Sequence, residues 1–131
     1  MSAEQYKKPL GLKLHQRSRE LELEYTGDER YSLPCEYLRV YSPSAEVRGH
    51  GSGQETLQTG KIHVGITAIK PVGRYAVQLV FDDGHDTGLY SWDYLYELCT
   101  QQSQRWEDYL DRLNEAGASR DPDVQVMHFQ P

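Results

Sequence analysis

Apolar residues fall at every second position in two runs near the start of the chain, which predicts two antiparallel strands. Leucines occupy positions 10, 12 and 14, and a second run places Leu21, Leu23 and Tyr25 between glutamates. Because these glutamates would face water, the second run is typical of a half-exposed strand. Residues 1–9 precede the alternation, end at Pro9, and are predicted to form a flexible tail.

The pattern then changes to one that predicts a short helix followed by a long irregular stretch. Pro34 suits the first position of a helix, because its fixed φ angle matches helical geometry. The helix would present an apolar stripe of Tyr37, Leu38 and Tyr41, and Ser42-Pro43-Ser44 would end it. Residues 44–60 hold four glycines and no apolar periodicity, so they form either a functional loop or a floppy surface loop.

Alternation returns between residues 62 and 81, where it predicts a β-hairpin. Apolar residues at 62, 64, 66 and 68 mark one strand, and Val77, Leu79 and Phe81 mark the next. Residues 70–74 include Pro71 and Gly73 and are typical of a turn. Because this connection is short, the two strands should pair antiparallel.

One long helix is predicted towards the end of the chain. Ser91 is a suitable N-cap, and Gly117 suits the position that follows the last helical residue. The apolar positions between them with helical spacing are Trp92, Leu95, Cys99, Trp106, Tyr109, Leu110 and Leu113. Asp121-Pro122 bars further helix, and Val124 and Val126, with His128 as an optional third residue, could add an edge strand.

These elements predict a single α+β domain over residues 10–118, followed by a C-terminal extension over residues 119–131. Its antiparallel or mixed sheet would have four to six strands, with one short helix and one long C-terminal helix. Gly27, Glu36, Tyr37 and Leu38 also meet Gly84, Asp93, Tyr94 and Leu95 at an offset of 57 positions. This echo is either coincidence or the mark of two similar units, and the second reading would bring residues 42–51 close to His85.

Charge and composition narrow the classes of function. The chain has 131 residues, enough for one modest core, and a net charge of −6. Its basic residues are scattered, which argues against nucleic acid as the main ligand. No apolar run approaches the ~20 residues that span a bilayer, and the first residues lack the apolar segment of a secretory signal. We therefore expect a cytoplasmic protein, with Cys35 and Cys99 as reduced thiols on the inner sides of helices.

The most distinctive chemistry surrounds His85, which lies in an acidic turn with Asp82, Asp83 and Asp86. These carboxylates should raise the pKa of His85, so the ring could be cationic near neutral pH. His85 could fix the turn through hydrogen bonds to backbone. Alternatively it could bind a metal, with His50 as the best distant second ligand and His63 as the next.

The other polar residues of interest follow the short helix. Arg39 either pairs with an acid such as Glu46 or presents its guanidinium group to a partner. The residues predicted to form a partner-binding surface are Arg39, Ser42, Ser44, Glu46, His50, Asp83 and His85.

No recognisable catalytic set accompanies these residues. Ser42 and Ser44 could be nucleophiles only beside a base and an oxyanion hole, and no G-x-S-x-G motif occurs. The glycine-rich residues 49–53 have no Walker lysine, which argues against a phosphate cradle. We expect no catalysis by this chain alone.

Two long motifs carry a family resemblance. LPCEYLRVYSPSAEVRGHG at residues 33–51 is followed by IKPVGRYAVQLVFDDGHDTGLYSWDYLYELC at residues 69–99. In this order they resemble the gamma-butyrobetaine hydroxylase-like N-terminal domain family, which occurs in bacteria as short stand-alone proteins of unknown function. Similar domains are also fused to P-loop ATPases that carry iron–sulfur clusters.

The resemblance also implies a metal site, which this sequence lacks in its family form. In the larger hydroxylases a similar domain holds a structural zinc through three cysteines after the Leu-Arg motif and a histidine in the later acidic turn. Those positions fall on Ser42, Ser44, Val47 and His85 here. Three of the four ligands are thus replaced by groups that bind zinc poorly or not at all, and no cofactor is expected.

Together these observations predict a small, non-catalytic interaction or adaptor domain that binds a protein of unknown identity. The alternative is a metal-binding accessory protein that uses His85 and His50, with a link to iron–sulfur metabolism. A third class is an enzyme with a small site at the acidic turn. A homodimer is a further option, because a thin tyrosine-rich domain can leave an apolar face exposed.

Overall fold

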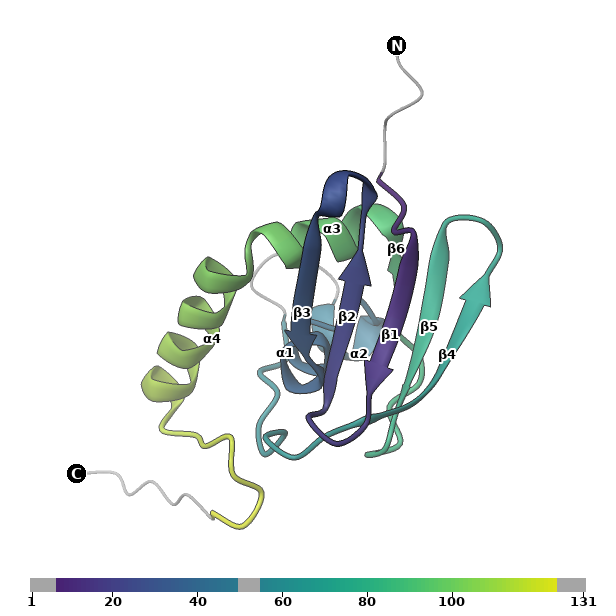
Figure 1. The fold of residues 1–131 in the computed structure, drawn as a ribbon. Helices are drawn as coiled ribbons and strands as arrows, with labels where there is room; N and C mark the ends of the chain where they lie inside the picture. Colours follow the sequence, from purple (N-terminus) through teal and green to yellow (C-terminus); the bar gives the residue numbers. More distant parts are fainter. Residues whose placement is uncertain (1–6, 50–54, 125–131) are drawn as a thin grey trace, which may run out of the picture.

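The computed structural model describes residues 7–49 and 55–124, which form two three-stranded antiparallel sheets with helices packed beside them (Figure 1). The strands are β1 (Gly11–His15), β2 (Glu20–Glu24), β3 (Arg30–Pro34), β4 (Ile66–Val72), β5 (Ala76–Phe81) and β6 (Leu89–Ser91). The helices are the 3-10 turn η1 (Thr26–Asp28), α1 (Cys35–Val40), α2 (Ala45–Arg48), α3 (Trp92–Thr100) and α4 (Gln102–Ala116). The predicted α+β class with antiparallel strands is confirmed, but the six strands form two sheets of three instead of one sheet. The expected pair of helices is confirmed only in part, because the described residues form four α-helices.

The first sheet follows from the alternation at the start of the chain. β1 pairs with β2, so that Leu14 faces Leu21 and Leu12 faces Leu23. The two leucines of β2 are fully buried, and the glutamates between them stay half-exposed. Strand β3 was not predicted, because Leu33 is its only buried residue and Pro34 was assigned to a helix.

The second sheet contains the predicted hairpin with a later start. Strand β4 begins at Ile66, and the turn lies at residues 73–75. The apolar alternation in the sequence begins before Ile66 and includes Val64, which is buried. However, Val64 belongs to a turn and not to a strand, because its amide donates to the Lys61 carbonyl. Strand β6 pairs with β5 and has three residues, too short for a periodic signal.

The predicted long C-terminal helix is two helices, α3 and α4, with a break at Gln101 (φ −112°, ψ 20°). Both predicted ends are confirmed: the Ser91 hydroxyl accepts a hydrogen bond from the Tyr94 amide, and Gly117 ends α4 in the left-handed conformation. Just before the break, the Thr100 hydroxyl donates to the carbonyls of Tyr96 and Glu97, which weakens the helical ladder. The break lets α4 extend away from the sheets (Figure 1).

The region between the short helix and the hairpin also differs from expectation. Pro34 caps α1, which starts one residue later than predicted. Residues 45–48 form α2, inside a stretch expected to be irregular, and residues 50–54 lie outside the described part of the chain.

Each half of the domain consists of three strands followed by a helix. The internal echo suggested two similar units, but with a single strand before the glycine turn and helix of each. Tyrosine hydroxyls join the two halves through buried hydrogen bonds: Tyr37 donates to the Leu98 carbonyl (2.8 Å), and Tyr90 donates to the Leu38 carbonyl (2.6 Å). The main core lies between the halves and includes Cys35 and Cys99, both free and buried as expected. This joint brings the end of α1 beside the connection from β5 to β6.

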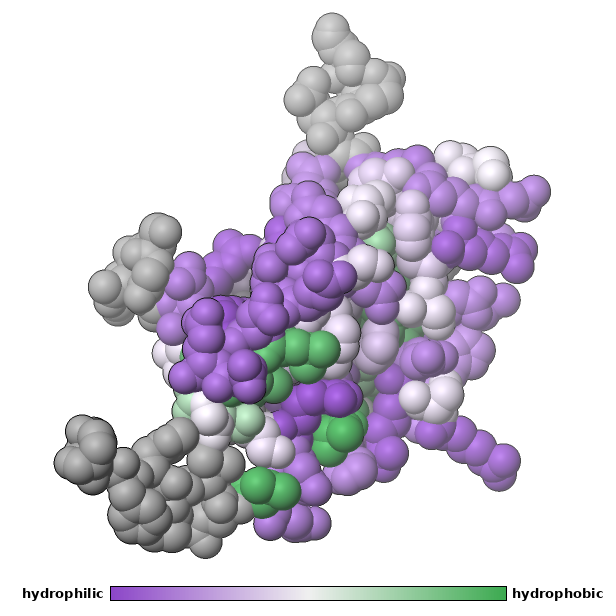
Figure 2. Space-filling model, turned by 90° about the vertical axis from the view of Figure 1, so that its left-hand side faces the viewer, coloured by the Kyte–Doolittle hydropathy of each residue, from purple (hydrophilic) through white to green (hydrophobic). Residues whose placement is uncertain are grey.

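Neither end of the described chain has the predicted structure, which was a flexible tail at the N-terminal end and an edge strand at the C-terminal end. Pro9 is buried, and Lys7 Nζ lies 2.5 Å from a Glu29 carboxylate oxygen, so residues 7–9 of the predicted tail contact the domain. Val124 is not in a strand, and Val126 and His128 lie outside the described residues. No helix formed by residues 7–49 and 55–124 has the length and apolar character needed to cross a bilayer. On the α4 side, hydrophobic residues form small separate patches among hydrophilic ones (Figure 2).

Candidate functional site

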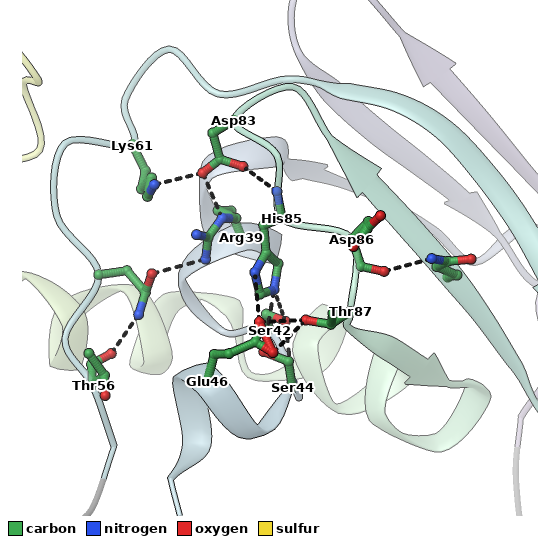
Figure 3. Close-up of polar contacts among 12 residues, drawn as sticks. Arg39, Ser42, Ser44, Glu46, Thr56, Lys61, Asp83, His85, Asp86 and Thr87 are labelled. Atoms are coloured by element: carbon green, nitrogen blue, oxygen red, sulfur yellow. Dashed lines mark hydrogen bonds and ion pairs between the residues drawn. The ribbon is translucent and has the colours of Figure 1, made fainter.

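The predicted site residues meet where the α1–α2 segment contacts the β5–β6 connection, and we call this cluster the corner (Figure 3). Arg39 comes from the last turn of α1, Ser42 and Ser44 from the link that follows, and Glu46 from α2. Asp83 and His85 come from the β5–β6 connection. Of the seven predicted residues only His50 lies outside the described part of the chain.

Asp83 is the centre of one half of the corner. One of its carboxylate oxygens accepts hydrogen bonds from Arg39 Nε (2.9 Å) and Lys61 Nζ (2.6 Å). The other accepts from the backbone amide of His85 (3.2 Å). Burial works to raise the pKa of Asp83, but these bonds outweigh it and lower the pKa to about 2.

His85 is the centre of the other half. Its Nε2 atom lies 2.8 Å from Ser42 Oγ and 3.3 Å from Ser44 Oγ, and its Nδ1 atom lies 3.7 Å from a Glu46 carboxylate oxygen. The Thr87 hydroxyl donates to the same carboxylate. The expectation of a raised pKa is wrong: burial and then the nearby Arg39 lower the pKa of His85, and Glu46 and Asp83 offset this only in part. His85 is therefore neutral at pH 7.

Four of the residues predicted to form a partner-binding surface are buried. Arg39 is 7% exposed, Ser42 1%, Ser44 5% and His85 9%. Arg39 pairs with Asp83 instead of Glu46, and its guanidinium group points into the fold rather than toward a partner. Of the residues that meet at the corner, Glu46 and Asp83 are the ones with exposed surface.

Sequence reasoning missed Lys61, Gln58 and Thr87, which complete the corner. Gln58 accepts a hydrogen bond from an Arg39 terminal nitrogen (3.0 Å). These residues are polar, lie in loops and follow no periodicity, so no local signal pairs them with the corner. Their contacts arise from the way the loops close around α1.

The corner contains a hydroxyl and an imidazole arranged like a nucleophile and its base, but the hydroxyl is buried. Ser42 Oγ and His85 Nε2 are within hydrogen-bond distance, and a carboxylate lies beyond the ring. However, Ser42 is covered by Gly88, where an added Cβ would stand 2.5 Å from Ser42 Oγ. The Ser42 hydroxyl, in a residue that is 1% exposed, is therefore not presented to solvent in this structure.

The corner also does not fit the zinc that the family resemblance implies. A zinc ion needs four donors, and the Ser42 and Ser44 hydroxyls are already turned to His85 Nε2 while Val47 has no donor atom. Residues 7–49 and 55–124 hold no group of three or more histidine, cysteine or acidic side chains suited to a metal. The predicted pair of His85 and His50 lies partly outside these residues.

An open pocket of about 860 Å³ lies next to the corner. Its walls come from the end of α1, the α2 region, α3 and α4. Aromatic and cationic residues lining it include Tyr41, Tyr94, Arg48, Arg105 and Arg112. This pocket was not predicted, because its residues are spread over 73 positions of the sequence (40 to 112) and meet only in the folded chain.

The lowered pKa of His85 predicts a pH-dependent stability. Between the ordinary value of 6.5 and the lower pKa of the folded ring, the unfolded chain binds a proton at this ring while most folded chains do not. The free energy of unfolding should therefore fall as the pH drops through and below 6.5. Urea denaturation at pH 7.5 and pH 5.5 measures the loss.

Two glutamine variants isolate the contribution of this ring. His85→Gln should show a smaller loss between pH 7.5 and pH 5.5 than the wild-type chain, whatever its absolute stability. His63→Gln makes the same change at an exposed histidine and should keep the wild-type slope. Equal slopes in all three proteins would mean that His85 does not control the acid sensitivity.

Comparison with known proteins gives one family and several similar solved structures. The family model described as gamma-butyrobetaine hydroxylase-like, N-terminal, matches residues 12–96. Two structures described only as NMR solution structures are each 52% identical: one covers 96% of this chain and 99% of its own, with a TM-score of 0.80, and the other covers 99% and 98%, with a TM-score of 0.78.

The third is a crystal structure of a protein of unknown function in the DUF971 family from Acidithiobacillus ferrooxidans. It is 38% identical, covers 70% of this chain and 91% of its own, and has a TM-score of 0.58. No curated protein matches the chain.

Proposed function

Since this chain belongs to the gamma-butyrobetaine hydroxylase-like N-terminal domain family, we propose that it is a non-catalytic domain that binds a partner protein. The observation that carries the proposal is the contrast between the corner and the pocket. The reactive groups of the corner bond one another inside the fold. The adjacent pocket presents charged and aromatic side chains to solvent.

In this proposal the corner is a structural joint and the pocket is the working surface. The corner ties the two halves of the domain together, so it fixes α1 and α2 against β5 and β6. Of these elements, α1 and α2 also contribute one side of the pocket. A rigid scaffold that positions exposed side chains of different elements is typical of protein-binding sites.

A photo-crosslinking amino acid placed at two positions in living cells tests the proposal. At Asp108, an exposed pocket residue on α4, it should give one discrete crosslinked product. At Lys70, an exposed residue of β4 on the opposite side of the domain, it should not give that product. The same products from both positions, or none from either, would contradict a partner-binding role for the pocket.

A further inference from the structure

The pocket beside the corner has a floor of two tyrosine rings with guanidinium groups over them. Arg48 Cζ lies 4.7 Å from the centre of the Tyr94 ring, and Arg105 Cζ lies 5.7 Å from it. Arg105 and Arg112 lie 5.4 and 5.8 Å from the centre of the Tyr41 ring. Three cations from α2 and α4 thus converge on one pair of rings.

Both rings are held in place by their hydroxyls. The Tyr94 hydroxyl donates to the Tyr41 carbonyl (2.6 Å), and the Tyr41 hydroxyl donates to the Arg105 carbonyl (2.6 Å). These bonds connect α3, the end of α1 and α4. The rings therefore offer fixed surfaces for the guanidinium groups, which reduces the entropy lost when a ligand binds.

The three arginines differ in whether their guanidinium groups already pair with other side chains of the domain. Arg105 donates from Nε to the Gln101 side chain (3.0 Å) and lies 3.6 Å from a Glu97 carboxylate. Among the described residues, no carboxylate lies within 4.0 Å of a side-chain nitrogen of Arg48 or Arg112. Their forked donors are available to a planar anion.

Acidic residues also line the pocket, and they decide which anion fits. Glu55, Glu97, Asp108 and Asp111 are exposed, and so is Arg48, whereas Arg105 and Arg112 are half-buried. The two arginines of α4 are therefore less exposed than the acids, and Arg48 lies at the rim of the pocket. A dianionic phosphate would be repelled by the acids, but a carboxylate carries one charge and matches the arginine fork.

We propose that the pocket binds a glutamate or aspartate side chain of an acidic segment in the partner protein, seated between Arg48 and Arg112 over the tyrosine rings. This inference rests on the proposed function and names the chemistry of its partner. The net charge of −6 disfavours general attraction of acidic peptides, so binding must come from this local site.

A titration with short peptides tests the inference, because a chain of 131 residues gives well-resolved NMR spectra. The probe is acetyl-Ala-Glu-Glu-Ala-amide at up to about 10 mM, a range suited to the weak affinity of a single charged contact. Amide signals of α2 and α4 around the pocket should shift with saturation. The matched peptide with glutamines in place of the glutamates should cause no such shift.

Variants separate the pocket from general charge effects. Combined Arg48→Gln and Arg112→Gln should weaken binding of the glutamate peptide about 10-fold or more, with a folded spectrum otherwise retained. Arg17→Gln, a change of the same charge in the exposed β1–β2 turn, should leave the affinity unchanged.

Three results would overturn the inference. They are shifts away from the pocket, equal binding of the glutamine peptide, and tighter binding of a phosphoserine peptide than of the glutamate peptide. If the peptides fail in any of these ways while crosslinking at Asp108 still yields a discrete partner, the acidic-segment inference falls and the interaction-domain proposal stands.

Discussion

Replacing Asp83 with alanine is expected to lower the free energy of unfolding by about 2–4 kcal/mol. The change leaves the Arg39 guanidinium, which is 7% exposed, without its carboxylate partner. Breaking a fully buried ion pair costs about 3–5 kcal/mol, and the partial exposure of Asp83 reduces this figure. Urea denaturation followed by tryptophan fluorescence at pH 7 gives the difference.

The matched control is Asp86→Ala, three residues later in the same connection. Asp86 is exposed, and its backbone carbonyl rather than its carboxylate accepts the hydrogen bond from Gln78. Its replacement should change stability by less than about 0.5 kcal/mol. If Asp83→Ala is as mild as Asp86→Ala, the corner is not the joint that holds the two halves together.

A double variant shows whether the cost comes from the orphaned charge. Arg39→Met removes the guanidinium and keeps an apolar side chain of similar length. Combined with Asp83→Ala, it should destabilise the protein by less than the sum of the two single variants, because no unpaired buried charge is left. Additive losses would mean that Arg39 and Asp83 act independently.

Placing cysteines at the three positions that the resemblance to the larger hydroxylases implies as zinc ligands should convert the corner into a zinc site, and this is the second large effect. The change combines Ser42→Cys, Ser44→Cys and Val47→Cys with the native His85. In a tetrahedral zinc site, sulfur and nitrogen ligands stand about 3.5 Å apart. The Ser42 and Ser44 oxygens already lie 2.8 and 3.3 Å from His85 Nε2, so a small outward shift of longer cysteine side chains suffices.

The triple variant, purified without an affinity tag, should contain one zinc ion per chain by elemental analysis. With free zinc about 1,000-fold above the Kd, binding should add about 4 kcal/mol to the free energy of unfolding and raise Tm by roughly 10–20 °C. The same variant with His85→Ala should lose most of the zinc. A folded triple variant without zinc would mean that these positions do not converge on one point.

The parts of the fold that were predicted correctly are those that follow from the periodic spacing of apolar residues and from helix-capping residues. Alternating residues gave β2 and β5, and the ends of the C-terminal helical region followed from Ser91 and Gly117. Two strands were not predicted, because neither shows an alternating pattern: β3 buries one residue fully, and β6 has three residues. The break at Gln101 escaped because helical periodicity continues through it, and the backbone turns there for a local reason at Thr100.

The sequence predicted that the distant residues of the corner would meet, but it did not predict that they would be buried or that His85 would be neutral. The echo between the halves brought residues 42–51 toward His85, which the structure bears out for Ser42, Ser44 and Glu46. The neighbouring carboxylates suggested a cationic histidine, whereas burial outweighs them. Burial depends on what packs over a side chain, here including Gly88 against Ser42, and no local pattern in the sequence encodes it.

The central claim is that the corner is a closed structural joint, and a pH titration of the His85 ring nitrogens by NMR tests it most directly. The account predicts a midpoint below 6.5, a ring that is neutral at pH 7, and signals that do not move when zinc is added. A midpoint at or above 6.5, or a stoichiometric shift of the ring signals with zinc, would contradict it.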